Sequence, residues 1–383
     1  MPNIQKTKSG KWKAIVEMGK DPVTGRRKRK TKTKPTKKEA NAWIAEQVQK
    51  RDNGIVVDPK NYTLKEYLCR WLKDYAEPNL AATTYDGYEV IVKSHLIPAL
   101  GQLKIDEIKP MHIQSYFTQK RSRGRKDGQS GGLSEKTLLQ HFRVLSKALK
   151  QAVKWQLISN NPAKAVEAPK PKRSKDIKAM TKEQLNKLLA AAKEESEWIY
   201  NFTLVAAYTG MRRSELLGLP WDNVDFENET IRVKQALVTK VGEGSTIKET
   251  KSKSGTRPIK ISEKLINALK NQKELQKKDK AKLGDKYDNE LNLVFCKEDG
   301  SKYYPTTVNK KFNRATKKAG LNKFGIHDLR HTHATLLLKS EVNPKIVQER
   351  LGHASITVTL DTYSHVTLDM QEGAVQKLDD LME

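Results

Sequence analysis

Cysteine is scarce in this chain of 383 residues, which contains only Cys69 and Cys296. Two cysteines cannot build a disulfide framework, and no pair has the Cys-x-x-Cys spacing of a zinc site. The sequence therefore excludes a small disulfide-rich secreted protein and a cysteine-ligated zinc domain. It fits a protein of a reducing compartment.

Long apolar runs are also lacking. A helix that crosses a membrane needs about 20 consecutive, mostly apolar residues, and no run in the chain approaches this length. The first residues, Met1–Gln5, do not have the apolar stretch of a signal peptide. We therefore expect a cytoplasmic protein that does not bind a membrane.

Acidic residues are few relative to basic ones. The chain has 45 Asp and Glu against 73 Lys and Arg, a formal net charge of +28 and a pI near 9.8. This surplus indicates a polyanionic partner, most simply nucleic acid; the alternative is a merely soluble basic protein. Hydrophobic residues make up 37%, enough for packed cores, and the length predicts two or three domains.

The positive charge is densest in residues 1–40, where fourteen Lys and Arg stand against three acids. Residues 11–17 alternate as a strand does, residues 21–25 form a turn, and residues 26–34 indicate a second strand, with a bend into a third left open. Thr36 is a suitable N-cap for a following helix, with Glu39 in the capping-box position. A small basic β-sheet with a helix is therefore predicted for residues 1–55.

Such a sheet can lay its strands in a DNA major groove. The alternative, a solvated basic tail, does not account for the apolar positions Trp12, Ile15 and Trp43. The expected DNA contacts come from the basic side chains of the two strands: Lys11, Lys13, Arg26, Arg27, Lys28, Arg29, Lys30 and Lys32.

Residues 60–167 carry helical spacing after a linker at residues 53–61. Helices are predicted from Thr63, over 82–95, from Pro110, and from Ser134 through Val153. The last of these should end at Asn160-Asn161-Pro162, and residues 121–132 should form a mobile loop. The aromatic and leucine positions are expected to form the core of a helical bundle rather than to contact DNA.

A Pro- and Lys-rich linker follows at residues 168–175, which either crosses a DNA backbone between two domains or is an inert spacer. Residues 176–383 are expected to form one mainly helical domain with a small β-sheet. Thr181 and Gln184 should cap a helix, and residues 198–207 should form an apolar one. Strands are predicted at 230–233 and 257–261, and an exposed Lys-rich helix at 265–283.

Three short patterns in this last domain carry the chemistry: Thr209-Gly-Met-Arg212, His327-Asp-Leu-Arg330 and Leu351-Gly-His353, followed by Tyr363. Attack on a phosphodiester adds negative charge to the nonbridging oxygens, which guanidinium groups stabilise without a metal. Arg212 should open a helix after the Gly210 break, whereas Arg213 points about 100° away. His327 and Arg330 share one helical face.

In their order and spacing these patterns resemble the tyrosine recombinases, the phage integrase family. The resemblance implies that Tyr363 is the nucleophile and forms a 3′-phosphotyrosyl link without cofactor, metal or ATP. Arg212 and Arg330 would clamp the phosphate, His327 would handle the proton of the nucleophile, and His353 would donate to a nonbridging oxygen. Glu215 would orient Arg212. The general acid would be Lys251, with Lys253 as its rival.

The resemblance further implies an arm-site-binding domain, a core-binding domain and a catalytic domain, and double-stranded DNA attachment sites with core and arm sites. A tetramer on two duplexes is the family expectation, together with a DNA-bending host factor and an excision factor. The protein would integrate and excise a phage or mobile element in a bacterial cytoplasm. The apolar spacing of residues 375–381 indicates a helix that docks on a neighbouring subunit or packs in cis.

Alternatives to this interpretation come from the same residues. A chromosome-dimer recombinase lacks the basic N-terminal segment, a type IB topoisomerase relaxes DNA without site preference, and a non-catalytic regulator uses only the basic surface. His331 and His333 suggest a zinc site, but the segment has no cysteine and no His-Glu-x-x-His pattern, and the two side chains point apart.

Overall fold

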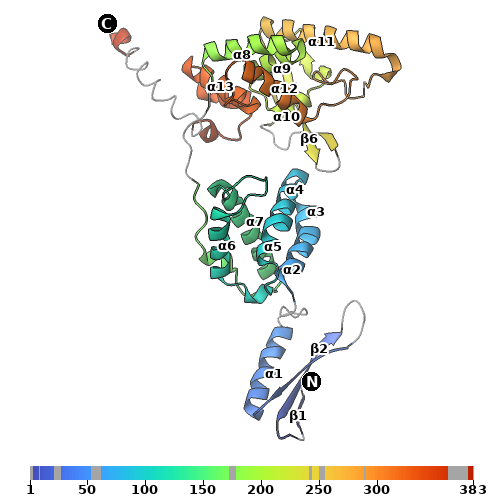
Figure 1. Cartoon of the computed structure of the whole chain (residues 1–383), viewed down its shortest axis with the longest axis vertical. Helices are drawn as coiled ribbons and strands as arrows, with labels where there is room; N and C mark the ends of the chain where they lie inside the picture. The colour runs from blue at the N-terminus through green and yellow to red at the C-terminus, as the bar shows by residue number, and fades with distance from the viewer. Residues whose placement is uncertain are drawn as a thin grey trace. The chain divides into compact units, whose positions relative to one another are not determined.

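The computed structural model describes residues 3–7, 9–20, 27–52, 62–171, 178–240, 244–249, 255–288, 290–360 and 378–382. The chain divides into two compact units, residues 1–172 and 173–383. Figure 1 shows the sheet and helix of the N-terminal end, the helical bundle that follows them in sequence, and the larger C-terminal unit.

The N-terminal end forms a three-stranded antiparallel sheet in the order β1 (Asn3–Lys6), β2 (Trp12–Lys20), β3 (Arg27–Lys34). Helix α1 (Lys37–Asp52) packs on β2, and Ala14, Val16 and Ala40 are buried. The Glu39 amide donates to the Thr36 hydroxyl at 3.2 Å, which confirms the predicted cap. Strand β1 was not predicted, because its four residues show no apolar alternation.

The rest of the first unit is a helical bundle. Its helix α2 begins at a capping box between Thr63 and Glu66, and its core is built from large side chains such as Tyr67, Trp71 and Phe117. Two helices continue through single π-helical turns, at residues 72–76 and 92–96. The helices are α2 (Leu64–Trp71), α3 (Glu77–Asn79), α4 (Ala82–Ile91), α5 (Ile97–Leu100), α6 (Pro110–Ser122) and α7 (Glu135–Lys154), with 3₁₀ turns at Ile105–Glu107 and Pro162–Ala165.

Helix α7 runs through Val153 as predicted, but it stops at Lys154, before the predicted stop at residues 160–162. Gln156 adopts a left-handed conformation with φ 57°, and the Leu157 amide donates to the Ala152 carbonyl at 2.9 Å. These are the features of a Schellman termination, here with glutamine in the position usually taken by glycine. The helix therefore stops at Lys154, and Asn161 instead caps the 3₁₀ turn at residues 162–165.

The second unit packs its helices around α9 (Glu197–Thr209), most of whose side chains are buried. Two small sheets accompany them, one of order β4-β5-β8 and one hairpin of β6 and β7. The strands are β4 (Val224–Asp225), β5 (Thr230–Val233), β6 (Gln235–Lys240), β7 (Gly244–Glu249) and β8 (Arg257–Lys260); the other helices are α8 (Lys182–Glu195), α10 (Arg213–Leu217), α11 (Glu263–Leu283), α12 (Pro305–Lys318), α13 (Ile326–Lys339) and α14 (Pro344–Leu351), with 3₁₀ turns at Trp221–Asn223 and Gly284–Lys286.

Helix α11 corrects the expectation of an exposed helix, because the first half of it belongs to the core. Leu265, Ile266 and Leu269 are buried against the domain, and Gln272 accepts a hydrogen bond from the buried Asn201 amide at 3.3 Å. Within the described parts of the chain, every helix is too short or too polar to span a membrane.

Candidate active site

The break after α9 lies where three helices converge. Gly210 adopts φ 64°, and a side chain there would meet His333 of α13 at 2.7 Å and Leu351 of α14 at 2.8 Å. The Thr209 hydroxyl donates to the Val205 carbonyl at 2.6 Å, so the last turn of α9 is fixed from within. Both the backbone conformation and the lack of space therefore require glycine at this position.

Arg330 is buried on α13 and binds two of these backbone segments. Its side chain is 3% exposed; Nη1 donates to the Gly210 carbonyl at 2.8 Å and Nη2 to the Leu351 carbonyl at 2.7 Å. A buried guanidinium costs free energy unless its hydrogen bonds are made. These two hydrogen bonds fix the orientation of the guanidinium and connect α13 to the ends of α9 and α14.

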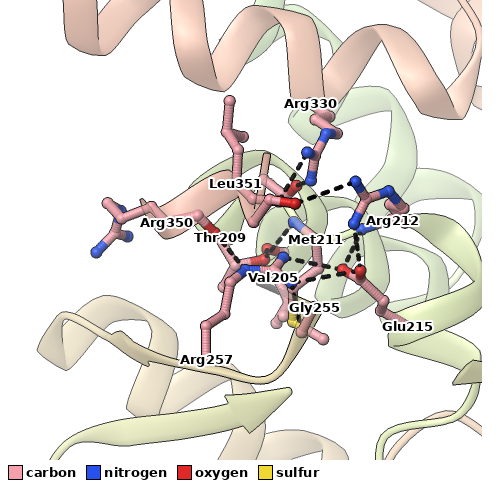
Figure 2. A network of polar contacts seen from close by, with 12 residues as sticks. Val205, Thr209, Met211, Arg212, Glu215, Gly255, Arg257, Arg330, Arg350 and Leu351 are labelled. Atoms are coloured by element: carbon pink, nitrogen blue, oxygen red, sulfur yellow. Dashed lines mark hydrogen bonds and ion pairs between the residues drawn. The ribbon is translucent and has the colours of Figure 1, made fainter. Parts of the chain in front are cut away.

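Arg212 reaches the same end of α14 from the N-cap position of α10. Nη2 of Arg212 lies 3.5 Å from the Gly352 carbonyl, and Nη1 pairs with the Glu215 carboxylate at 2.7 Å. Its guanidinium and that of Arg330 thus contact consecutive carbonyls, at residues 352 and 351. Figure 2 shows both side chains beside Leu351. Arg213 instead donates to Asn309 on α12 at 2.7 Å.

Glu215 is the buried centre of this network. It is 3% exposed, and its carboxylate accepts from the Arg212 amide at 2.9 Å as well as from the Arg212 side chain. Burial raises the pKa of the Glu215 carboxyl, but the hydrogen bond and charge of Arg257, followed by those of Arg212, outweigh burial and lower it below its ordinary value. The predicted contact with Arg212 is therefore present.

Arg257 is the residue of this network whose contacts the sequence did not disclose. It begins β8 and is 6% exposed, and Nη2 pairs with Glu215 at 2.9 Å across 42 positions of sequence. Its Nε donates to the Arg350 carbonyl at 2.6 Å. In the sequence, Arg257 only marks the register of the Thr-Lys…Arg…Ser pattern of the family, which selects Lys251. No local pattern indicates such distant partners.

His353 follows Gly352, which ends α14 in the left-handed conformation with φ 67°, as predicted. Its Nδ1 lies 2.8 Å from the Thr359 hydroxyl, and its carbonyl accepts from Gln348 at 2.8 Å. Partial burial, followed by the charges of Arg330 and Arg212, lowers the pKa of His353 to about 4. The imidazole is therefore neutral at pH 7.

His327 lies one turn before His331 on α13, and their rings meet edge to face with centroids 4.9 Å apart. Although the His327 side chain is partly open to solvent, desolvation and the charge of Arg330 lower its pKa. His333 faces elsewhere, with Nδ1 2.9 Å from the Ala207 carbonyl. Among the described residues there is no cluster of three His, Cys, Asp or Glu side chains that could hold a metal.

Three residues predicted for the catalytic site lie outside the described residues: Lys251, Lys253 and Tyr363. The described chain ends at Glu249 of β7 on one side of the lysines and resumes at Gly255, two residues before β8. The segment before the tyrosine is helical at residues 356–360.

The sheet register shows on which face of the N-terminal sheet each basic residue lies. Lys32 and Lys30 pair with the buried Ala14 and Val16, and so lie on the face that α1 covers. Lys13 and Arg29 lie on the opposite face. Arg29 also pairs with Glu17 at 3.1 Å. Lys11 is exposed beside β2, the side chains of Arg27 and Lys28 are not described, and Arg26 lies outside the described residues.

Together the second unit places the guanidiniums of Arg212, Arg257 and Arg330 at the end of α14, beside the neutral imidazole of His353. Desolvation lowers the pKa of the exposed His327 of α13, and the charges of Arg330 and Arg212 are near enough to lower it further. Cations held by buried partners favour binding of an anion such as a phosphodiester. Elements α9, α10, β8, α13 and α14 contribute to this cluster, so that residues 140 positions apart are held together.

Family models account for most of the chain. The phage integrase family matches residues 178–369, the phage integrase N-terminal SAM-like domain matches 63–120, and an arm DNA-binding domain matches 3–50. A XerC-like tyrosine recombinase of Caldanaerobacter subterraneus subsp. tengcongensis is 30% identical over 98% of this chain and 97% of its own. The ICEBs1 integrase of Bacillus subtilis is 27% identical over 99% of this chain and 100% of its own.

Solved structures agree with the fold. A structure of the Tn1549 transposon integrase with transposon right end DNA matches with a TM-score of 0.69 and 26% identity, over 83% of this chain and 99% of that one. A lambda integrase tetramer bound to a Holliday junction matches with a TM-score of 0.55 and 19% identity, over 93% of this chain and 97% of that one. The second likeness concerns the fold alone.

Proposed function

Since this chain belongs to the phage integrase family and is a site-specific tyrosine recombinase of the phage and mobile-element type, we propose that it cuts and rejoins DNA through a 3′-phosphotyrosyl intermediate with Tyr363 as the nucleophile. The phenol oxygen attacks the phosphorus, the 5′-oxygen leaves, and a 5′-hydroxyl later reverses the step. The phosphoester bond energy is kept, so no ATP is consumed.

The observation that carries this proposal is the contact of Arg330 and Arg212 with consecutive carbonyls, at Leu351 and Gly352, directly before His353. Two guanidiniums in fixed positions match the charge that develops on the nonbridging oxygens. Because arginine stays charged at any working pH, this clamp does not depend on a pKa.

His353 completes the clamp as a neutral donor. When the Thr359 hydroxyl donates to Nδ1, the remaining proton of the imidazole is on Nε2, where it can donate to a phosphate oxygen. His327 takes the phenol proton, and its lowered pKa keeps the imidazole neutral and therefore able to accept it. The leaving 5′-oxygen is protonated by Lys251 or by its rival Lys253.

The N-terminal sheet is proposed to bind arm-type DNA through the face opposite α1, where Lys13 and Arg29 lie. The helical bundle and the catalytic unit would bind the core site. Four protomers would assemble on two duplexes, as in the lambda integrase tetramer on a Holliday junction. A host DNA-bending protein and an excision factor would direct integration and excision in the bacterial cytoplasm.

A two-fragment recombination assay tests the reaction as a whole. Two linear fragments of different length, each with an attachment site from the ends of the element, are incubated with the protein without metal or ATP. Recombination yields fragments with exchanged flanks. Relaxation of a supercoiled plasmid without exchange would indicate a type IB topoisomerase, and binding without any change in the DNA would indicate a regulator.

A further inference from the structure

Three consecutive carbonyls at the end of α14 accept hydrogen bonds from three arginines on three different elements. Leu351 accepts from Arg330 of α13, and Gly352 from Arg212 at the start of α10. Arg350 accepts at 2.6 Å from Nε of Arg257, the first residue of β8. The last carbonyls of a helix have no partners within the helix and carry its negative dipole end, so cations stabilise them.

We propose that Arg257 is a positioning residue for strand cleavage, which acts through Glu215 on Arg212 and through the Arg350 carbonyl on the segment that carries His353. This inference rests on the proposed function. Arg257 would touch neither the phosphate nor the nucleophile; it would fix the groups that do.

Glu215 connects Arg257 to Arg212: it is 3% exposed and binds both arginines. Arg257 donates to both carboxylate oxygens, through Nη2 at 2.9 Å and Nη1 at 3.3 Å. A buried carboxylate that loses such a partner tends to take up a proton. A protonated Glu215 would hold the Arg212 side chain weakly, and the guanidinium would lose its fixed direction.

Arg257 also holds the end of α14, through the backbone of Arg350. The Arg350 side chain points away from the cluster, toward the carbonyls of Lys260 and Tyr208. It is the Arg350 carbonyl that joins this residue to the cluster, through its hydrogen bond from Nε of Arg257. Because His353 is only three residues further on, a shift of this carbonyl would move the imidazole relative to the phosphate.

Lysine cannot replace this arrangement. Nε of Arg257 donates to the Arg350 carbonyl. Nη1 donates to the Gly255 carbonyl and to the Glu215 carboxylate, to which Nη2 also donates. An ammonium is a point charge and cannot reach all of these acceptors, which the guanidinium contacts through its three nitrogens. The variant R257K therefore keeps the positive charge but cannot make this set of hydrogen bonds.

The test compares full-length wild type, R257K, E215Q and the double variant in single-turnover cleavage of a nicked attachment-site duplex, with the covalent protein–DNA adduct as readout. R232K, an exposed arginine of the same sheet, is the matched control. At saturating DNA, R257K should form the adduct at least about 10-fold more slowly than wild type, with unchanged DNA affinity, while R232K should match wild type.

In R257K the acid limb of the pH profile of cleavage should move to higher pH, because Glu215 takes up its proton more readily. The double variant should be no slower than the slower single variant, since both act in one unit.

Wild-type rate and pH profile in R257K, or multiplied losses in the double variant, would overturn the inference. Should R257K be unfolded at the assay temperature by circular dichroism, E215Q decides, and a wild-type rate in E215Q overturns it. Absence of adduct with wild type itself would instead overturn the proposed function, so the two failures are distinguishable.

Discussion

Arg212 and Arg213 are adjacent and chemically identical, yet their surroundings differ. Arg212 is held by the buried Glu215 and lies near the Gly352 carbonyl, whereas Arg213 binds Asn309 on α12. The sequence singled out Arg212 through the family pattern and the turn of the helix. It did not single out Arg257, because a contact across 42 residues leaves no local signal.

This adjacent pair provides a matched test. R212Q should lower the rate of strand cleavage by about 10²–10³-fold, because one donor to the charged phosphate oxygens is lost. R213Q should change it by less than about 10-fold, since Arg213 is outside the proposed clamp. Single-turnover cleavage of a nicked site at saturating protein measures both. Equal losses would mean that the clamp is assigned to the wrong guanidinium.

Gly210 is a second residue whose role is steric. In G210A the added Cβ would meet His333 at 2.7 Å and Leu351 at 2.8 Å, in a conformation with φ 64°. The free energy of unfolding should fall by about 3 kcal/mol, from left-handed strain and overpacking together. G320A is the control, because its φ of 70° carries the strain but its surroundings are open. It should lose only about 1 kcal/mol.

Urea unfolding of both glycine variants measures these losses. Cleavage should also be slower in G210A, because the Gly210 carbonyl receives Nη1 of Arg330. If the two variants were equally stable, the convergence of α9, α13 and α14 at Gly210 would be looser than the structure shows.

Helix starts that depend on local capping could be predicted from the sequence, whereas the end of α7 and the burial of α11 could not. Thr36, Ser134 and Thr181 each accept from a backbone amide at the start of a helix, as expected. The end of α7 was placed too late, because Gln156 takes a left-handed conformation that glutamine rarely adopts. The buried half of α11 was missed because lysines dominate its sequence.

One element carries a pH dependence of its own. His141 of α7 is 1% exposed and lies 2.8 Å from the Tyr116 hydroxyl of α6. Burial, followed by His95 and Lys120, lowers the pKa of His141 to about 4. The unfolded chain binds this proton near pH 6.5, so stability is full above that pH and falls as the pH drops toward 4.

The expected loss at pH 4.5 is about 2 kcal/mol in the free energy of unfolding. H141Q, which does not titrate, should flatten this part of the profile relative to wild type. Urea unfolding between pH 7.5 and about 4.5, followed by circular dichroism, gives the difference between the two profiles. Parallel profiles would show that His141 keeps its ordinary pKa in the folded protein.

At the scale of the whole molecule, the three-part architecture could be predicted, because charge, periodicity and linker composition change along the chain. The N-terminal end alone holds fourteen of the 73 basic residues. The face of the sheet that carries them could not be predicted, because it depends on which side α1 covers. The register shows that Lys13 and Lys32 lie on opposite faces.

Removal of residues 1–55 should leave cleavage of a core site intact and abolish integration, because the arm contact is lost. In the full-length chain, K13E should weaken arm-site binding about 10-fold and reduce its salt dependence, whereas K32E should weaken it less. Binding titrations at several salt concentrations compare the two. Normal integration by the truncated protein would contradict the arm-binding assignment.

Covalent trapping shows whether Tyr363 forms a bond to the DNA strand that the protein cuts. A nicked attachment-site duplex is incubated with wild type and with Tyr363→Phe, without metal or ATP, and separated on a denaturing gel. We expect a protein–DNA adduct with wild type and none with Tyr363→Phe, while both proteins bind the duplex. An adduct that persists in Tyr363→Phe would contradict the choice of nucleophile, and no adduct on DNA that wild type binds would contradict strand transfer itself.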